Sequence, residues 1–104
     1  MQNDEQQKIR EIQFVNLVSA LAASAMQQLG KLVNPLTGKT EVNLQAAKAT
    51  IDMLEMLRDK TKGNCNEEET TLLKTTITHL QLNYVDQVNQ PAPKEPAPSE
   101  ENSK

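Results

Sequence analysis

Apolar residues recur at the helical period in three separate stretches of the chain. In the first stretch, residues 5–29, they lie mostly three or four positions apart, and neither glycine nor proline interrupts them. Residues with this spacing share one face of an α-helix, so the pattern predicts one long helix. Gly30 follows directly, and glycine readily adopts the left-handed conformation that ends many helices.

The other two stretches carry start and stop signals as well as an apolar stripe. We predict a helix over 43–62, capped by Asn43 and ended by Gly63, and a helix over 67–88, capped by Asn66. Short connections favour antiparallel neighbours. The sequence therefore predicts an all-α domain over residues 1–88, a three-helix antiparallel bundle with a long first helix.

After Val88 the composition changes abruptly. Residues 89–104 contain repeated prolines and no large apolar side chain. Such a segment cannot bury enough apolar surface to offset the entropy of ordering, so we predict a disordered, Pro-rich C-terminal tail.

The connection between the first two helices, residues 31–42, contains turn residues. Pro35 fixes a backbone φ for a turn, and Gly38 permits a positive φ three residues later. The tripeptide Gly38-Lys39-Thr40 matches the end of a phosphate-binding loop, but Val33 stands where that loop needs its first glycine. We interpret the segment as a turn with a solvated lysine, and the sequence leaves open whether it is a passive link or a recognition loop.

The composition favours a small helical core and a cytoplasmic protein. Phe14 and Tyr84 are the only aromatic residues, so the core must come from aliphatic residues and methionine. The single cysteine, Cys65, excludes an intrachain disulfide. The first residues are polar and acidic, unlike an export signal, and no apolar run is long enough to cross a membrane. We therefore expect a cytoplasmic location with no membrane association.

Small residues surround much of the first helix between Ser19 and Ala25. Small side chains let a second backbone approach closely, and a small core without large aromatic anchors favours self-association. We predict a homodimer whose closest contact involves Ser19, Ala22, Ala23 and Met26. The leading functional hypothesis is a non-enzymatic interaction or adaptor protein with an unknown protein partner.

The alternative is a small RNA- or ribosome-associated factor that uses a cluster of cations. The residues of this candidate basic patch are Lys31, Lys39, Arg58, Lys60 and Lys62. The net charge of −3 and the lack of interleaved aromatic residues both weigh against nucleic-acid binding.

No residue pattern predicts catalysis, a cofactor site or a metal site. His79 has no carboxylate at the neighbouring helical positions, so we interpret it as a partly exposed helical residue. Cys65 precedes three glutamates, which disfavour a thiolate. Those glutamates, Glu67–Glu69, are adjacent and diverge around the helix, so they fit capping better than metal binding.

Several motifs, in order along the chain, carry a family resemblance: Asn34-Pro-Leu-Thr-Gly-Lys-Thr-Glu-Val-Asn-Leu44, Ile51-Asp-Met-Leu-Glu-Met-Leu57, Lys60-Thr-Lys-Gly-Asn64 and Asn83-Tyr-Val85. With these motifs, the chain from Phe14 to Val85 resembles a bacterial family of short three-helix proteins known only as a domain of unknown function. The resemblance implies a helical domain ending near Val88 and no established activity or cofactor. Cys65 departs from it, since an apolar residue such as leucine is expected there.

Overall fold

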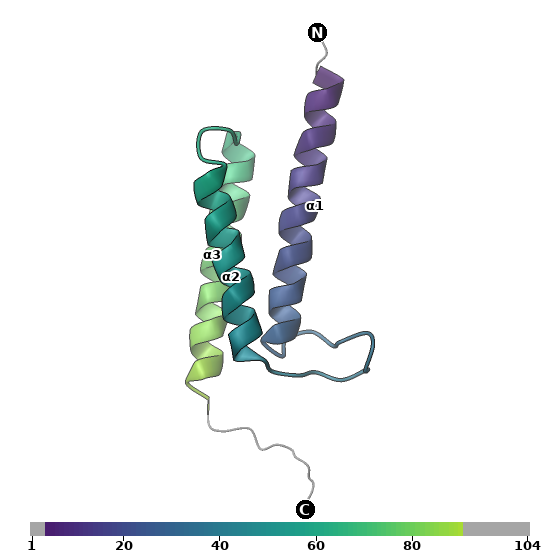
Figure 1. Ribbon diagram of the computed structural model, residues 1–104, viewed down its shortest axis with the longest axis vertical. Helices are drawn as coiled ribbons and strands as arrows, with labels where there is room; N and C mark the ends of the chain where they lie inside the picture. Colours follow the sequence, from purple (N-terminus) through teal and green to yellow (C-terminus); the bar gives the residue numbers. More distant parts are fainter. Residues whose placement is uncertain (1–3, 91–104) are drawn as a thin grey trace, which may run out of the picture.

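Three α-helices account for most of the part of the chain that the computed structural model describes, residues 4–90. They are α1 (Asp4–Gln28), α2 (Leu44–Lys60) and α3 (Glu67–Val88), and consecutive helices run antiparallel (Figure 1). The predicted all-α three-helix bundle is confirmed, and each predicted helix boundary agrees to within two residues. Most of the predicted tail, residues 91–104, lies outside the described part.

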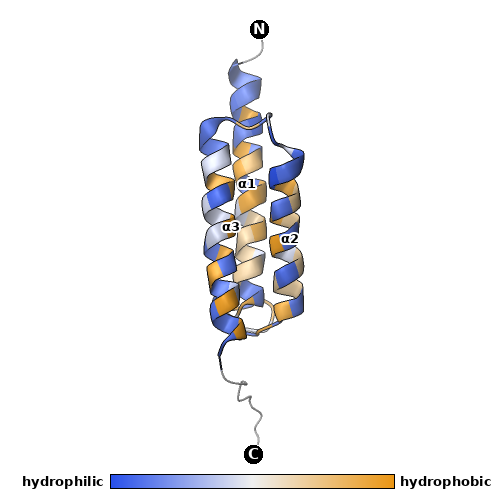
Figure 2. Ribbon diagram, turned by 90° about the vertical axis from the view of Figure 1, so that its left-hand side faces the viewer, coloured by the Kyte–Doolittle hydropathy of each residue, from blue (hydrophilic) through white to orange (hydrophobic). Residues whose placement is uncertain are grey.

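The core consists of aliphatic side chains from all three helices and from Leu29, the residue that directly follows α1. The buried apolar residues are Val18, Ala25, Leu29, Ala47, Ile51, Leu54, Leu73, Ile77 and Leu80. Figure 2 shows α1 along the gap between α2 and α3, with apolar residues over much of its length. Phe14 and Tyr84 are only half-buried at the edge of this core. The core is thus made without a buried aromatic ring, as the composition predicts.

Asparagine side chains cap the second and third helices at the predicted positions. Oδ1 of Asn43 accepts a hydrogen bond from the backbone N–H of Ala46 at 3.0 Å. At the start of α3, Oδ1 of Asn66 accepts from the N–H of Glu69 at 2.7 Å, while the Glu69 carboxylate accepts from the N–H of Asn66 at 2.9 Å. This reciprocal pair is the predicted capping box, and it fixes where α3 begins.

The connection from α1 to α2 is closed at its base by backbone pairing. The N–H of Lys31 donates to the carbonyl of Met26, and that of Gly30 to Gln27, a pair of bonds typical of a helix ending at a left-handed glycine. Gly30 has φ 78° as this motif requires. The N–H of Asn43 then donates to the carbonyl of Gln28 at 2.7 Å. The chain therefore leaves α1 and enters α2 at nearly the same place.

Beyond this base the connection forms a hairpin, residues 34–39. The N–H of Asn34 donates to the carbonyl of Lys39, and the N–H of Gly38 donates to the carbonyl of Asn34, both at 2.8 Å. Gly38 has φ 73°, the positive value that the sequence permits. Figure 1 shows the hairpin projecting from the end of α1, on the side away from α2 and α3.

The opposite end of α1 extends past the rest of the bundle. The Glu11 carboxylate accepts a hydrogen bond from Nδ2 of Asn66, at the turn between α2 and α3. The first residues of α1 continue beyond that turn (Figure 1). Among the described residues, no helix combines the length and apolar character needed to cross a membrane.

Candidate functional site

From residue 12 onward, the side of α1 that faces away from α2 and α3 is exposed and uncharged. No charged residue occurs between Glu11 and Lys31. By contrast, the exposed side of α2 carries several charged residues, including Lys48 and Asp52, whose Nζ and Oδ2 atoms are 3.2 Å apart. A surface helix normally places charges opposite its buried stripe. This part of α1 therefore has the composition of a helix that is covered on more than one side.

Six residues, five of them exposed, run along the middle of this side. Their spacing alternates between four and three positions, which keeps them on one line of the helix surface. We call this line the outer seam: Ile9, Gln13, Asn16, Ala20, Ala23 and Gln27. The two alanines permit close approach of another backbone, and the amides provide uncharged hydrogen-bonding groups. The outer seam therefore has the spacing and chemistry of a helix-packing surface.

The four residues predicted for the helix contact divide between this surface and the core. Ser19 and Ala23 are exposed, whereas Ala22 and Met26 are half-buried and pack against the core. Ala23 is the member of the predicted set that also lies on the outer seam. The alternating four–three spacing of the seam is visible in the sequence, but only the burial pattern separates it from the inward-facing stripe.

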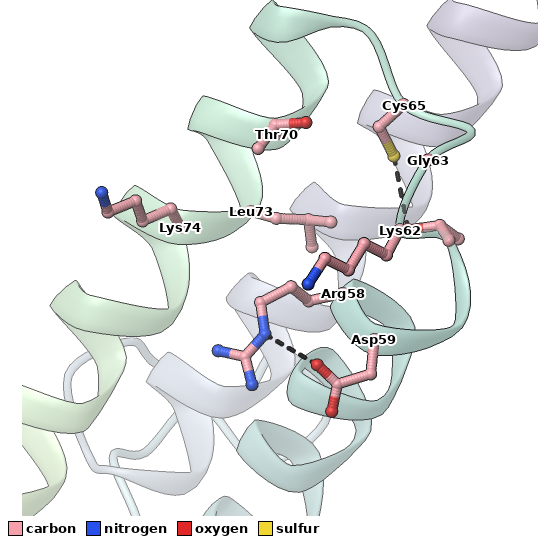
Figure 3. Close-up of a pocket in the computed structure, with 9 residues that line it drawn as sticks. Arg58, Asp59, Lys62, Gly63, Cys65, Thr70, Leu73 and Lys74 are labelled. Atoms are coloured by element: carbon pink, nitrogen blue, oxygen red, sulfur yellow. Dashed lines mark hydrogen bonds and ion pairs between the residues drawn. The ribbon is translucent and has the colours of Figure 1, made fainter.

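A second candidate site lies where α2 turns toward α3. A hollow of about 370 Å³ is lined by the cationic side chains of Arg58, Lys62 and Lys74, with Leu73 and Cys65 among its other walls (Figure 3). We call it the basic hollow. Nε of Arg58 donates a hydrogen bond to Oδ1 of Asp59 at 3.1 Å. Three cations outnumber the single carboxylate of Asp59 in the lining, so the hollow combines net positive charge with an apolar wall and suits an anionic ligand.

Lys74 is the member of the basic hollow that the sequence analysis missed. It lies one helical turn after Thr70, which also lines the hollow. Because the capping box fixes the start of α3, the common face of these two residues could have been inferred from their spacing. That they face the end of α2 depends on the packing of the two helices.

The structure does not bring the five predicted cations into one patch. Arg58, Lys60 and Lys62 lie at or just after the C-terminal end of α2, while Lys31 and Lys39 lie before its N-terminal end. The 17 residues of α2 separate the two groups by about 25 Å. Nζ of Lys31 instead lies 3.7 Å from Oδ2 of Asp86, near the end of α3.

Cys65 and His79 each lie beside a polar side chain one helical turn away in sequence. Sγ of Cys65 donates a hydrogen bond to Oγ1 of Thr61 at 3.3 Å. Nε2 of His79 lies 3.4 Å from Nδ2 of Asn83, and both side chains are on α3. Within residues 4–90, no group of three or more His, Cys, Asp or Glu side chains is arranged to hold a metal ion.

The model of the family described as "Domain of unknown function (DUF1844)" matches residues 11–86. The chain belongs to the DUF1844 family. The resemblance inferred from the sequence motifs is thereby confirmed, and the match extends from the first part of α1 nearly to the end of α3.

A search among curated proteins and a search among solved structures each found no match to this DUF1844 chain. The family description names no substrate, cofactor or partner. The outer seam of α1 and the basic hollow are candidate binding surfaces of this DUF1844 domain.

Proposed function

We propose that this DUF1844 protein is a non-enzymatic interaction protein that forms a homodimer through the exposed side of α1. The observation that carries the proposal is the uncharged stretch between Glu11 and Lys31, on a helix that has one side exposed. Covering such a side gains about 25 cal/mol per Å² of apolar surface and desolvates no charged group.

The small core gives the proposal further support. Its nine buried apolar residues include no aromatic side chain. A domain of this size buries a limited share of its surface, and association is one way in which small domains gain stability. We propose that the dimer then presents its remaining helical surface to another protein.

The mass of the full-length protein, measured by sedimentation over a range of concentrations, tests this proposal. We expect a dimer, and we expect Ala23→Glu to shift the protein toward the monomer because it places a charge in the contact. Ala49→Glu is the matched control, since Ala49 is exposed on α2. A wild-type protein that remains monomeric throughout, or equal effects of the two variants, would contradict the proposal.

Ala22→Leu is a less direct probe of the same contact. Added volume at this position overpacks a helix interface and is expected to cost about 1–3 kcal/mol. Because Ala22 is half-buried against the core, the substitution is expected to lower the stability of the monomer as well as the dimer. If it changes neither the oligomer mass nor the melting temperature, Ala22 takes no part in either contact.

The basic hollow supports a second candidate function, binding of RNA or a ribosomal surface. The observation that favours it is that Arg58, Lys62 and Lys74 line one hollow. The triple alanine variant should bind a single-stranded RNA probe more weakly, and its affinity should depend less on salt between about 50 and 200 mM. Lys48→Ala, on the exposed side of α2, is the control. Equal binding by all three proteins would reject this function.

We propose that the protein has no catalytic activity and that it acts in a bacterial cytoplasm. The hydrogen-bonded positions of Cys65 and His79, neither paired with a carboxylate among the described contacts, support a non-catalytic role. The single cysteine is consistent with a reducing compartment, and the bacterial setting comes from the family resemblance. Replacing Cys65 with Ser and His79 with Gln together is expected to leave self-association unchanged.

A further inference from the structure

Taking self-association from the proposed function, we propose a specific geometry for it. Two copies of α1 pack antiparallel along the outer seam, and the hairpin of each copy, residues 34–39, receives the first turn of α1 from the other. The occupant of the exposed side of α1 is thus a second copy of this chain. Three independent features support this arrangement.

The first feature is the symmetry of the outer seam. Its spacing is the same read from either end and is centred on position 18. An antiparallel pair about this centre places Ile9 opposite Gln27, Gln13 opposite Ala23 and Asn16 opposite Ala20. The last two pairs set a longer side chain against an alanine, so knobs and spaces alternate along the contact.

The second feature is the distribution of charge at the two ends of α1. In the antiparallel pair, the acidic first turn of α1, with Asp4 and Glu5, is level with the start of the second copy's connection to α2, whose hairpin carries Lys39. In a parallel pair, Glu5 would instead lie beside Glu5 of the second copy, and Lys8 beside Lys8 of the second copy. Opposite charges favour an interface and like charges oppose it. The charges therefore favour the antiparallel orientation.

The third feature is the position of the hairpin. It projects from the end of α1 on the exposed side (Figure 1), and its backbone is hydrogen-bonded across Asn34 and Lys39. Leu36 at its tip is 93% exposed. About the same centre, Asp4 of the second copy is level with residue 32, where the hairpin starts. The extended first turn of α1 therefore meets a preformed ledge with an exposed leucine.

Distances between spin labels test this geometry directly. In full-length protein with Cys65→Ser, labels are attached at Gln6→Cys or at Thr40→Cys, two exposed positions. Gln6 is twelve residues from the centre, so two Gln6 labels in an antiparallel dimer should be about 36 Å apart, at about 1.5 Å per residue. In a mixture of the two singly labelled proteins, a distance below about 25 Å should appear, because Gln6 of one copy is level with residue 30 of the other.

The label distances and the mass of the protein test the helix orientation, the hairpin contact and self-association separately. A dimer with a Gln6–Gln6 distance of about 10–20 Å would be parallel, which would overturn this geometry and leave the proposed self-association standing. A dimer with the long Gln6–Gln6 distance and no short Gln6–Thr40 distance would overturn the hairpin contact. A protein that sediments as a monomer at the labelling concentration would overturn the proposed self-association, and this geometry with it.

Discussion

Helices α1 and α2 are alike on their inner sides and different on their outer sides. The core takes three buried apolar residues from α2, and three from α1 together with Leu29, which directly follows it. The exposed side of α2 carries charges at Lys48, Asp52 and Lys60, whereas α1 has none between Glu11 and Lys31. Packing the core therefore does not explain the composition of the outer side. The uncharged side of α1 is a separate property, which the proposed dimer explains.

The largest effects are expected on the inner sides, where the two helices should behave alike. Leu29→Ala and Leu54→Ala each remove a side chain that is 0% exposed. Each is expected to lower the free energy of unfolding by about 2–5 kcal/mol, because a cavity remains. Urea denaturation at a fixed protein concentration measures this. Leu82→Ala, at 66% exposure, is the control and should change stability by less than about 1 kcal/mol. A Leu29→Ala variant as stable as this control would contradict an equal contribution from the C-terminal end of α1, which Leu29 directly follows.

Smaller effects are expected at the two left-handed glycines that follow α1. A Cβ at Gly38 meets no atom within 4 Å, so Gly38→Val should cost on the order of 1 kcal/mol from backbone strain alone. At Gly30 a Cβ would lie 2.8 Å from Cγ2 of Val42. Gly30→Val should therefore cost more than Gly38→Val in thermal unfolding. Equal costs would mean that Val42 moves aside freely, and a fully stable Gly38→Val variant would mean that strain at this turn is negligible.

Leu36 in the hairpin is expected to contribute to dimerisation and not to the stability of the monomer. Leu36 is 93% exposed in the hairpin and Leu82 is 66% exposed on α3. Leu36→Ser should weaken the dimer about tenfold, which corresponds to about 1.4 kcal/mol, because the first turn of the second α1 covers this residue. Its effect on unfolding of the monomer should be negligible. Leu82→Ser should leave the dimer unchanged, and equal effects of the two variants in sedimentation would remove Leu36 from the contact.

The smallest effect is expected on the charged side of α2. Lys48 and Asp52 form an ion pair between two exposed side chains, one helical turn apart. Exposed pairs of this kind contribute about 0.3–0.5 kcal/mol. Asp52→Asn should therefore change the urea midpoint only slightly and leave the dimer mass unchanged. A large loss of the dimer would mean that α2, rather than α1, carries the contact.

The helices could be predicted from sequence because their signals are local. Asn43 and Asn66 mark helix starts, Gly30 marks an end, and the apolar spacing defines the inner stripes. The capping box of Asn66 and Glu69 forms as predicted because its partners are three residues apart. Local hydrogen bonding and helical periodicity are thus sufficient to place the three helices.

The candidate sites were predictable only in part, because they depend on which segments meet in space. Lys31 follows the end of α1 and Lys62 follows the end of α2. Because these helices run antiparallel, the two residues lie at opposite ends of the bundle, and the predicted cation cluster is divided. Lys74 joins the basic hollow through packing of α3 against α2. Likewise, the small residues of α1 are evident in the sequence, but the inward orientation of Ala22 and the outward orientation of Ala23 follow from the bundle.

The closed base of the α1–α2 connection makes the hairpin a suitable place to engineer this fold. The chain departs at Gln28 and returns at Asn43, which are joined by a hydrogen bond of 2.7 Å. Insertions beyond such a closed base change loop entropy only slowly with length. Residues 34–39 can therefore be lengthened or exchanged while the three helices keep their positions. The hairpin is therefore a place where a reporter peptide can be inserted into this protein.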